Sequence, residues 1–394
     1  MRRLLFPHLV VWVLVIAVLR ITLVPAEVCP RAGADEIRTA IDRAVAWLDR
    51  GIGPDGRYVY GYTRGDAEPS ADYNVVRHAG VTMSLYRLAA AGQEGRLAVG
   101  DRALPFILDN LIRHDGWAAF AVAGGDASIG ANALTVAALA HRRLATGDGR
   151  YDDLMRELSD FLVAQQLADG SMLGRWSQRT QEPVPGSFAK FGTGEAFWAL
   201  GLMRRLFPDE SWDEPARAVA SYLATRRDDA EGYGTALPDH WAAYGLDEIR
   251  ALGLTEEELT YARNQAGYFG TSTRFESQSG QGWLSHLTRG GDASGAGLGT
   301  IGEALGSYWR LSRSQPELGD LESALAERLR CNAGRAVARQ ADAADAASSR
   351  RPSLVEGAWF TDGYTQMDDQ QHLISALLAA LAVVDDGAAD EDPA

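Results

Sequence analysis

The chain alternates between two kinds of helical segment, and this alternation restricts its fold more than any other feature. Six segments are amphipathic, as in the spacing of Ile37, Ile41 and Leu48, with charged residues between the apolar ones. The segments that alternate with them are rich in small and apolar residues nearly all round, for example 130–139 and 297–305. A helix that is apolar on every side is normally buried on every side. Polar outer helices that alternate with buried inner helices predict a double ring.

The helical spacing predicts an all-α chain, because no credible period-two alternation of apolar and polar residues occurs. Residues suited to anchoring the inner helices recur about every 60 residues, which leaves room for two helices and their loops in each repeat. We expect twelve helices at about 35–50, 74–92, 96–113, 130–146, 151–168, 192–207, 212–227, 239–253, 255–267, 295–312, 317–340 and 366–384.

Six hairpins of this kind resemble the (α/α)6 barrel superfamily, which includes six-hairpin glycosidases, polysaccharide lyases, sugar 2-epimerases and the terpenoid cyclase toroids. Residues 161–171 (Phe-Leu-Val-Ala-Gln-Gln-Leu-Ala-Asp-Gly-Ser) with Trp176 also resemble the Gln-Trp repeat of terpenoid cyclases, and 46–48 with 54–56 do so more faintly. The cyclases' Asp-x-Asp-Asp motif and the Cys/His ligand set of zinc prenyltransferases do not occur. The resemblance implies an (α/α)6 barrel over 27–384 and disfavours those two chemistries.

The composition limits the classes of molecule that this protein can bind. Hydrophobic residues make up 46% of the 394 residues, which is enough for a large core, and the formal net charge is −15. A chain this acidic, without any Lys/Arg-rich stretch, repels phosphate backbones, so the composition disfavours nucleic-acid binding as a function. Residues 385–394 form an acidic tail that we expect to be disordered.

The N-terminus has the pattern of an export signal. Residues 1–26 begin with Arg2 and Arg3, continue with an apolar run of 11 residues from Leu9 to Leu19, and end with small residues. The same segment is long enough to act as an uncleaved anchor, so cleavage and anchoring are both left open. Either way the sequence predicts an exported protein of the cell envelope that meets the membrane only through this segment.

Two cysteines, Cys29 and Cys331, are the only ones in the chain. A disulfide persists outside the cytoplasm, so one hypothesis is a bridge from the start of the mature chain to its last hairpin. The alternative is two unrelated thiols. Two cysteines cannot make a four-thiolate zinc site, and no ligand spacing calls for a metal or another cofactor.

The loops that lead from outer to inner helices emerge at one end of a double ring, which we call the mouth. They are rich in aromatic and polar side chains, which suit stacking and hydrogen bonding to sugars. The alternative is that long loops simply cap the ring. The candidate glycan-binding residues of these loops are Tyr60, Trp117, Trp176, Glu276 and Trp359.

Polar clusters begin the first and the last inner helix, and these clusters should be neighbours because the first and last hairpins close the ring. The spacing of Asn74, Arg77 and His78 puts them on one helix face. The alternative is that the aspartates and asparagine only cap the helices. The candidates are Asp72, Tyr73, Asn74, Arg77 and His78 in the first cluster and Asp368, Asp369, Gln371 and His372 in the last.

Two other inner helices start with ionisable groups. Glu195 precedes Trp198 on one face, and Asp239 is followed by His240 and Trp241. Each carboxylate has a capping alternative, since Glu is common at N3 and Asp is common at the N-cap. Glu303 lies among glycines, and we expect it inside the ring, paired with an arginine.

Three functions are compatible with these residues. The first is an inverting glycoside hydrolase, in which Glu195 or Asp239 faces Asp368 or Asp369 across the cavity. The second is a sugar epimerase or polysaccharide lyase that uses imidazoles, with candidates at His78, His240 and His372. The third is a glycan-binding toroid without catalysis. The expected partner in each case is a glycan or another small molecule.

Overall fold

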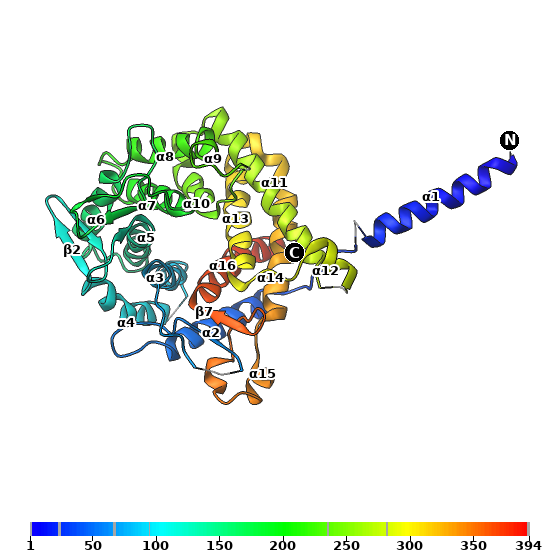
Figure 1. The fold of residues 1–394 in the computed structure, drawn as a ribbon, viewed down its shortest axis with the longest axis horizontal. Coiled ribbons are helices and arrows are strands. Elements are labelled where there is room, and N and C mark those ends of the chain that lie inside the picture. Colours follow the sequence, from blue (N-terminus) through cyan, green and yellow to red (C-terminus); the bar gives the residue numbers. More distant parts are fainter. Residues whose placement is uncertain are drawn as a thin grey trace.

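The computed structural model describes residues 2–22, 25–65, 68–93, 95–234, 236–280 and 283–391. Its helices form a double ring, which Figure 1 shows with the N-terminal helix α1 (Arg2–Thr22) projecting away from it. The inner helices are α3 (Val75–Ala90), α5 (Ile129–Thr146), α7 (Gly192–Leu206), α10 (His240–Ile249), α13 (Gly295–Ser314) and α16 (Met367–Glu391).

Each inner helix packs against the next one, and α16 packs against both α13 and α3, so the ring is closed. The outer ring consists of α2 (Ala34–Arg50), α4 (Arg96–Leu108), α6 (Asp152–Ala164), α8 (Asp213–Thr225), α11 (Glu256–Gln278) and α14 (Glu322–Arg339). The prediction of an all-α chain with six hairpins is confirmed. Shorter helices are α9 (Arg227–Ala230), α12 (Trp283–Arg289) and α15 (Ala343–Ala347), and three 3-10 turns cover Arg250–Leu252, Pro316–Leu321 and Pro352–Leu354.

Burial follows the sequence pattern. Helix α2 buries Ile37, Ile41 and Leu48 and exposes the charged residues between them. Helix α5 is buried at every residue from Ile129 to Arg142. Close packing of the inner ring depends on small residues, because a Cβ on Gly299 of α13 would lie 2.5 Å from the His372 backbone of α16. Small residues therefore bring the inner helices together around the axis.

Short antiparallel strands, which the sequence did not predict, lie in the loops at the mouth. β1 (Gly61–Thr63) pairs with β7 (Tyr364–Gln366), and β2 (Leu111–His114) pairs with β3 (Trp117–Phe120). β5 (Arg175–Ser177) lies between β4 (Ala127–Ser128) and β6 (Glu182–Pro183). The β1–β7 pair joins the first mouth loop to the last one, so it reinforces the closure of the ring.

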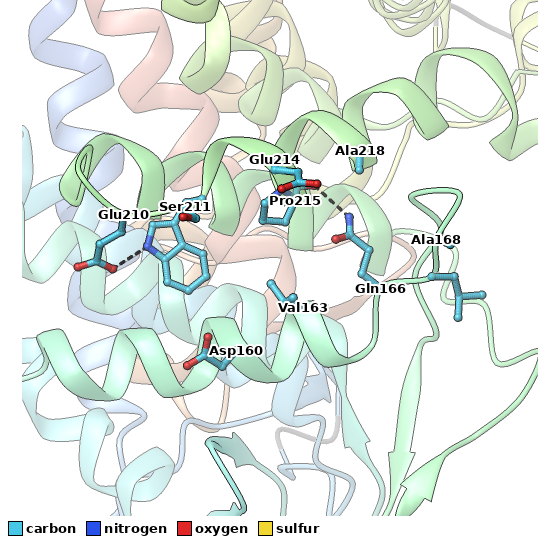
Figure 2. A pocket seen from close by; sticks show the side chains of 11 residues that line it. Asp160, Val163, Gln166, Ala168, Glu210, Ser211, Glu214, Pro215 and Ala218 are labelled. Atoms are coloured by element: carbon cyan, nitrogen blue, oxygen red, sulfur yellow. Dashed lines mark hydrogen bonds between the residues drawn. The ribbon is translucent and has the colours of Figure 1, made fainter.

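The segment that resembles a Gln-Trp repeat ties two outer helices together. Gln166 Nε2 donates a 3.0 Å hydrogen bond to the carbonyl of Pro215 at the start of α8, as Figure 2 shows from close by. Gly170 has a φ of +88°, and a Cβ there would overlap the carbonyl oxygen of Ala218. This position requires glycine for both reasons.

Cys29 and Cys331 form a disulfide that fastens the segment before α2 onto α14. Among the residues whose side chains the structure describes, no helix is both long and apolar enough to cross a membrane. The signal or anchor role of residues 1–26 stays a prediction. Helix α16 continues to Glu391, so the segment expected to be a disordered tail is helical over 385–391, while 392–394 lie outside the described residues.

Candidate functional site

A cavity of about 520 Å³ lies at the mouth, where the inner helices begin. All six inner helices or the residues just before them contribute to its wall. It is lined by Asn74, Val76, Arg77, Ser128, Gly130, Leu134, Ala189, Lys190, Phe191, Gly192, Glu195, His240, Trp241, Ala296, Gly297, Thr300, Asp368, Gln371 and His372. Eight of the residues predicted for the site are among these: Asn74, Arg77, Glu195, His240, Trp241, Asp368, Gln371 and His372.

Two imidazoles meet in this cavity. The rings of His240, at the start of α10, and His372, in the second turn of α16, are 5.1 Å apart and nearly perpendicular. Between them lies Glu303 of α13, which is fully buried, with its Oε2 2.6 Å from Nδ1 of His372 and 3.6 Å from Nε2 of His240. The other carboxylate oxygen of Glu303 accepts a hydrogen bond of 3.2 Å from the hydroxyl of Tyr244. The expected arginine partner of Glu303 is therefore wrong, since histidines and a tyrosine hold it.

The surroundings move the pKa values of the two imidazoles in opposite directions. Burial lowers the pKa of His240 well below its usual 6.5, so this ring is neutral. Burial acts in the same direction on His372, but the carboxylates of Glu303, Asp368 and Asp369 together outweigh it and raise the pKa of His372 to about 9. At neutral pH the cavity therefore holds one imidazole base beside one imidazolium acid, and such a divergence marks candidate acid–base groups.

Glu195 adds a carboxylic acid to the same wall. It is 7% exposed, and burial, reinforced by the charge of Asp239, raises its pKa to about 8. Gly130 of α5 has no side chain to occupy the space that the Glu195 carboxyl fills. At neutral pH Glu195 is therefore mostly protonated and can donate a hydrogen bond to a bound group.

Asp368 and Arg77 link the first and the last inner helix. Asp368 Oδ2 lies 3.2 Å from Nε of Arg77, and its Oδ1 lies 3.6 Å from Nε2 of His372. The prediction that the two polar clusters are neighbours is confirmed by this contact. Arg77 also contacts the hydroxyl of Tyr60, which places Tyr60 behind the arginine rather than among the lining residues.

Two of the four predicted catalytic carboxylates cap backbone instead of lining the cavity. Asp239 is fully buried, accepts hydrogen bonds from the amides of Trp241 and Ala242, and pairs with Arg227. Asp369 accepts hydrogen bonds of 2.7 Å from the amide of Ala296 and 2.9 Å from that of Gln366. Their oxygens are already occupied, so of the four only Glu195 and Asp368 line the cavity.

The predicted aromatic mouth residues pack the loops themselves. Trp117 and Trp176 meet edge to face at 5.0 Å, Trp198 stacks on Trp241 at 5.5 Å, and Trp359 donates its indole N–H to the carbonyl of Ala336. None of Trp117, Trp176, Trp198 and Trp359 lines the cavity, whose aromatic wall consists of Phe191 and Trp241.

His78 also lies outside the cavity. Its Nδ1 is 2.6 Å from the hydroxyl of Tyr73 and its Nε2 is 3.2 Å from the carbonyl of Ala103, and burial lowers its pKa to about 3. Asp72 bonds to Ser70 on the surface. These partners make His78, Tyr73 and Asp72 parts of the loop packing.

Glu276 has a structural place as well. It accepts a hydrogen bond of 3.1 Å from the amide of Ala293 and lies 3.9 Å from Arg335. Burial raises its pKa, and the backbone bond acts against that shift. It fastens the loop between α11 and α13 and does not line the cavity.

Lys190 and Phe191 line the cavity although the sequence reasoning did not select them. Both directly precede α7, the helix that carries Glu195, and this proximity in the chain was the available signal. Glu303 was placed inside the ring, but its histidine partners were not foreseen.

A second hollow, of about 560 Å³, lies on the outer ring between α6 and α8 and is shown in Figure 2. Its polar groups are already engaged in part, since Glu210 accepts the indole N–H of Trp212 and Gln166 bonds to Pro215. It contains no pair of titratable groups with opposed pKa shifts among the described residues, so the mouth cavity is the better candidate for chemistry.

No family model and no curated protein matches this sequence. Solved structures do match it. The cellobiose 2-epimerase from Spirochaeta thermophila aligns with a TM-score of 0.60 and 13% identity over 90% of this chain and 97% of that one. An unsaturated glucuronyl hydrolase specific for heparin aligns with a TM-score of 0.62 and 11% identity, over 89% and 98%. The α-1,6-mannanase from Salegentibacter sp. aligns with a TM-score of 0.59 and 13% identity, over 89% of this chain and 99% of that one. The chain therefore has the (α/α)6 barrel fold that the sequence pattern predicts.

Proposed function

We propose that this protein is a carbohydrate-active enzyme, and specifically a sugar epimerase in which His240 takes a proton from a sugar carbon and His372 gives a proton to it. The observation that carries the proposal is the pair of imidazoles 5.1 Å apart in one cavity, with pKa values shifted in opposite directions. A solved sugar epimerase from a ruminal bacterium and the cellobiose 2-epimerase share the fold, which supports the same class.

The proposed step inverts a carbon next to the carbonyl of an open-chain sugar. Neutral His240 removes the proton from that carbon, and the electrons of the broken C–H bond move to the carbonyl oxygen, forming an enediol-like intermediate. Glu195, which is mostly protonated, and Arg77 can donate hydrogen bonds to that oxygen as its charge develops. The two rings are in contact, so the planar intermediate turns about its C2–C3 bond and presents its other face. His372, held by Glu303, then gives its proton to that face of the carbon. Exchange with water returns both rings to their starting states.

Deuterium exchange tests this step directly. In D₂O, a reducing disaccharide such as cellobiose should gain deuterium at C2 and show the signals of its C2 epimer by NMR. His240→Gln and His372→Gln should each slow formation of the C2 epimer by at least about 100-fold, the range expected for loss of a general acid or base. His114→Gln, which removes an exposed imidazole outside the cavity, is the matched control and should keep the wild-type rate. Epimer formation at the wild-type rate in either cavity variant would refute the mechanism.

A second candidate is inverting glycoside hydrolysis, which a different observation favours. Glu195, with a pKa of about 8, has the protonation state of a general acid, and Asp368 on the same cavity is the carboxylate that could activate water. This function predicts new reducing ends from an oligosaccharide, with loss of that activity in Glu195→Gln and Asp368→Asn. Binding of oligosaccharides without either reaction would leave the third function, a glycan-binding toroid.

We further propose that the protein is exported to the cell envelope. The charged and apolar order of residues 1–26 and the Cys29–Cys331 disulfide both support this location, because disulfides persist in oxidising compartments. Cell fractionation, with N-terminal sequencing of the recovered protein, tests export and separates a cleaved signal from a retained anchor. Recovery of the full-length chain with free thiols in the cytoplasmic fraction would refute it.

A further inference from the structure

Lys190 is the only lysine in the chain, and the structure places it at the catalytic cavity. Apart from the histidines, every other basic side chain is an arginine. Lys190 lies in the loop between α6 and α7, is exposed, and is one of the residues that line the mouth cavity.

Lys190 contacts Phe191, and Phe191 is a neighbour of the proposed base. The Nζ of Lys190 lies 5.2 Å from the centre of the Phe191 ring, within the distance of a cation–π interaction. The Phe191 ring in turn lies 6.1 Å from the ring of His240. The lysine therefore borders the space in which a sugar bound next to His240 would lie.

The other cations at the cavity already have anionic partners. Arg77 pairs with Asp368, and His372 pairs with Glu303. Lys190 forms no ion pair with any residue in the part of the chain that the structure describes. Six inner helices also begin at this cavity, and their N-terminal ends carry partial positive charge. In a protein with a net charge of −15, the mouth is thus a local site with an unneutralised cation.

We propose that the substrate is an anionic sugar and that Lys190 binds its charged group, a carboxylate or a phosphate. This inference rests on the proposed function, because it names the substrate class of the same cavity. The lysine ammonium is a compact charge on a flexible stem, so it can reach a carboxylate or a phosphate. Lys190 can therefore bind a charged group that lies at a distance from the reacting carbon.

The experiment compares glucose, glucuronate and glucose 6-phosphate, which differ only at C6, in the deuterium-exchange assay. We expect the wild type to have a KM about fivefold lower for at least one anionic sugar than for glucose, as an exposed ion pair would give. Lys190→Gln should abolish this preference and Lys190→Arg should restore it. The preference should also fall as salt is raised. Arg179→Gln, which removes an exposed cation from the same loop away from the cavity, is the matched control and should keep it.

The outcomes separate the two proposals. Equal KM values for the three sugars in the wild type, or an equal effect of Lys190→Gln on all three, overturn the anionic-substrate inference and leave the epimerase intact. A preference for glucuronate or for glucose 6-phosphate identifies the anion. Absence of exchange and of binding with every sugar overturns the proposed function, and the inference falls with it.

Discussion

Replacing Glu195 by glutamine should stabilise the protein, and increasingly so as the pH rises. The glutamate is 7% exposed, and its pKa rises from the ordinary 4.5 to about 8, because burial and the charge of Asp239 both disfavour its ionised form. Glutamine has nearly the same shape and never ionises. The substitution therefore removes the free-energy penalty that burial places on ionisation of Glu195, while it keeps the packing.

The two pKa values determine the size and sign of the effect. Because the folded-state pKa lies above the unfolded-state value, the wild type has its full stability below pH 4.5 and loses stability as the pH rises through 8. Relative to low pH, this loss is about 1 kcal/mol at pH 5, about 3 kcal/mol at pH 7 and about 5 kcal/mol at pH 9. The advantage of the glutamine variant over the wild type should grow by these amounts.

Urea unfolding of both proteins at pH 5, 7 and 9 measures the difference. Glu182→Gln is the matched control, because Glu182 is an exposed glutamate of β6, and its difference from the wild type should stay flat with pH. A flat difference for Glu195→Gln as well, or a wild type that is more stable than the variant at pH 9, would refute the argument that Glu195 is held protonated.

Three further predictions concern an ion pair, a backbone contact and the disulfide. Glu303→Gln should lower the pKa of His372 from about 9, as measured by NMR titration of the imidazole, and an unchanged value contradicts the ion-pair account. Gly170→Ala should reduce the free energy of unfolding by about 2–4 kcal/mol, because the backbone strain at positive φ adds to the overlap with the Ala218 carbonyl oxygen. Gly147→Ala is the control, since its φ is +71° but its Cβ would lie in open space, and it should lose only about 1 kcal/mol in the same urea titration. Equal losses contradict the overlap. Cys29→Ser should reduce the free energy of unfolding by about 2–5 kcal/mol, because it removes the disulfide. Its melting curve should match that of the reduced wild type, and a mismatch would show that loss of the disulfide does not explain the change.

The ring was predictable because burial imposes a periodic pattern on the sequence. The all-round apolar character of α5 and the amphipathic spacing in α2 each have one physical explanation, and the structure shows both. The short strands at the mouth were missed, since pairs of two to four residues leave no period-two signal. Their register depends on partners far apart in the chain, as in Gly61 and Gln366.

The candidate site was only half predictable, because an aspartate at a helix start has the same sequence signature whether it caps or catalyses. Asp368 and Asp369 are adjacent, yet one faces the cavity and the other accepts two backbone amides. The helical rotation between neighbours decides which role each takes, and a residue's rotation about the helix axis is uncertain when the helix boundary is uncertain. Lys190 was not selected from the sequence, because a single lysine in a loop has no pattern that marks it, and its position became meaningful only once the cavity was defined.

The closure of the ring by α16 has a consequence for the order in which activity can arise. This last helix fills the gap between α13 and α3, and it brings both Asp368 and His372 to the cavity. A chain that stops before Met367 has five hairpins, an open ring and only half of the imidazole pair. During synthesis the cavity is therefore incomplete until the final hairpin is in place, and any chemistry that depends on both imidazoles has to wait for the end of the chain.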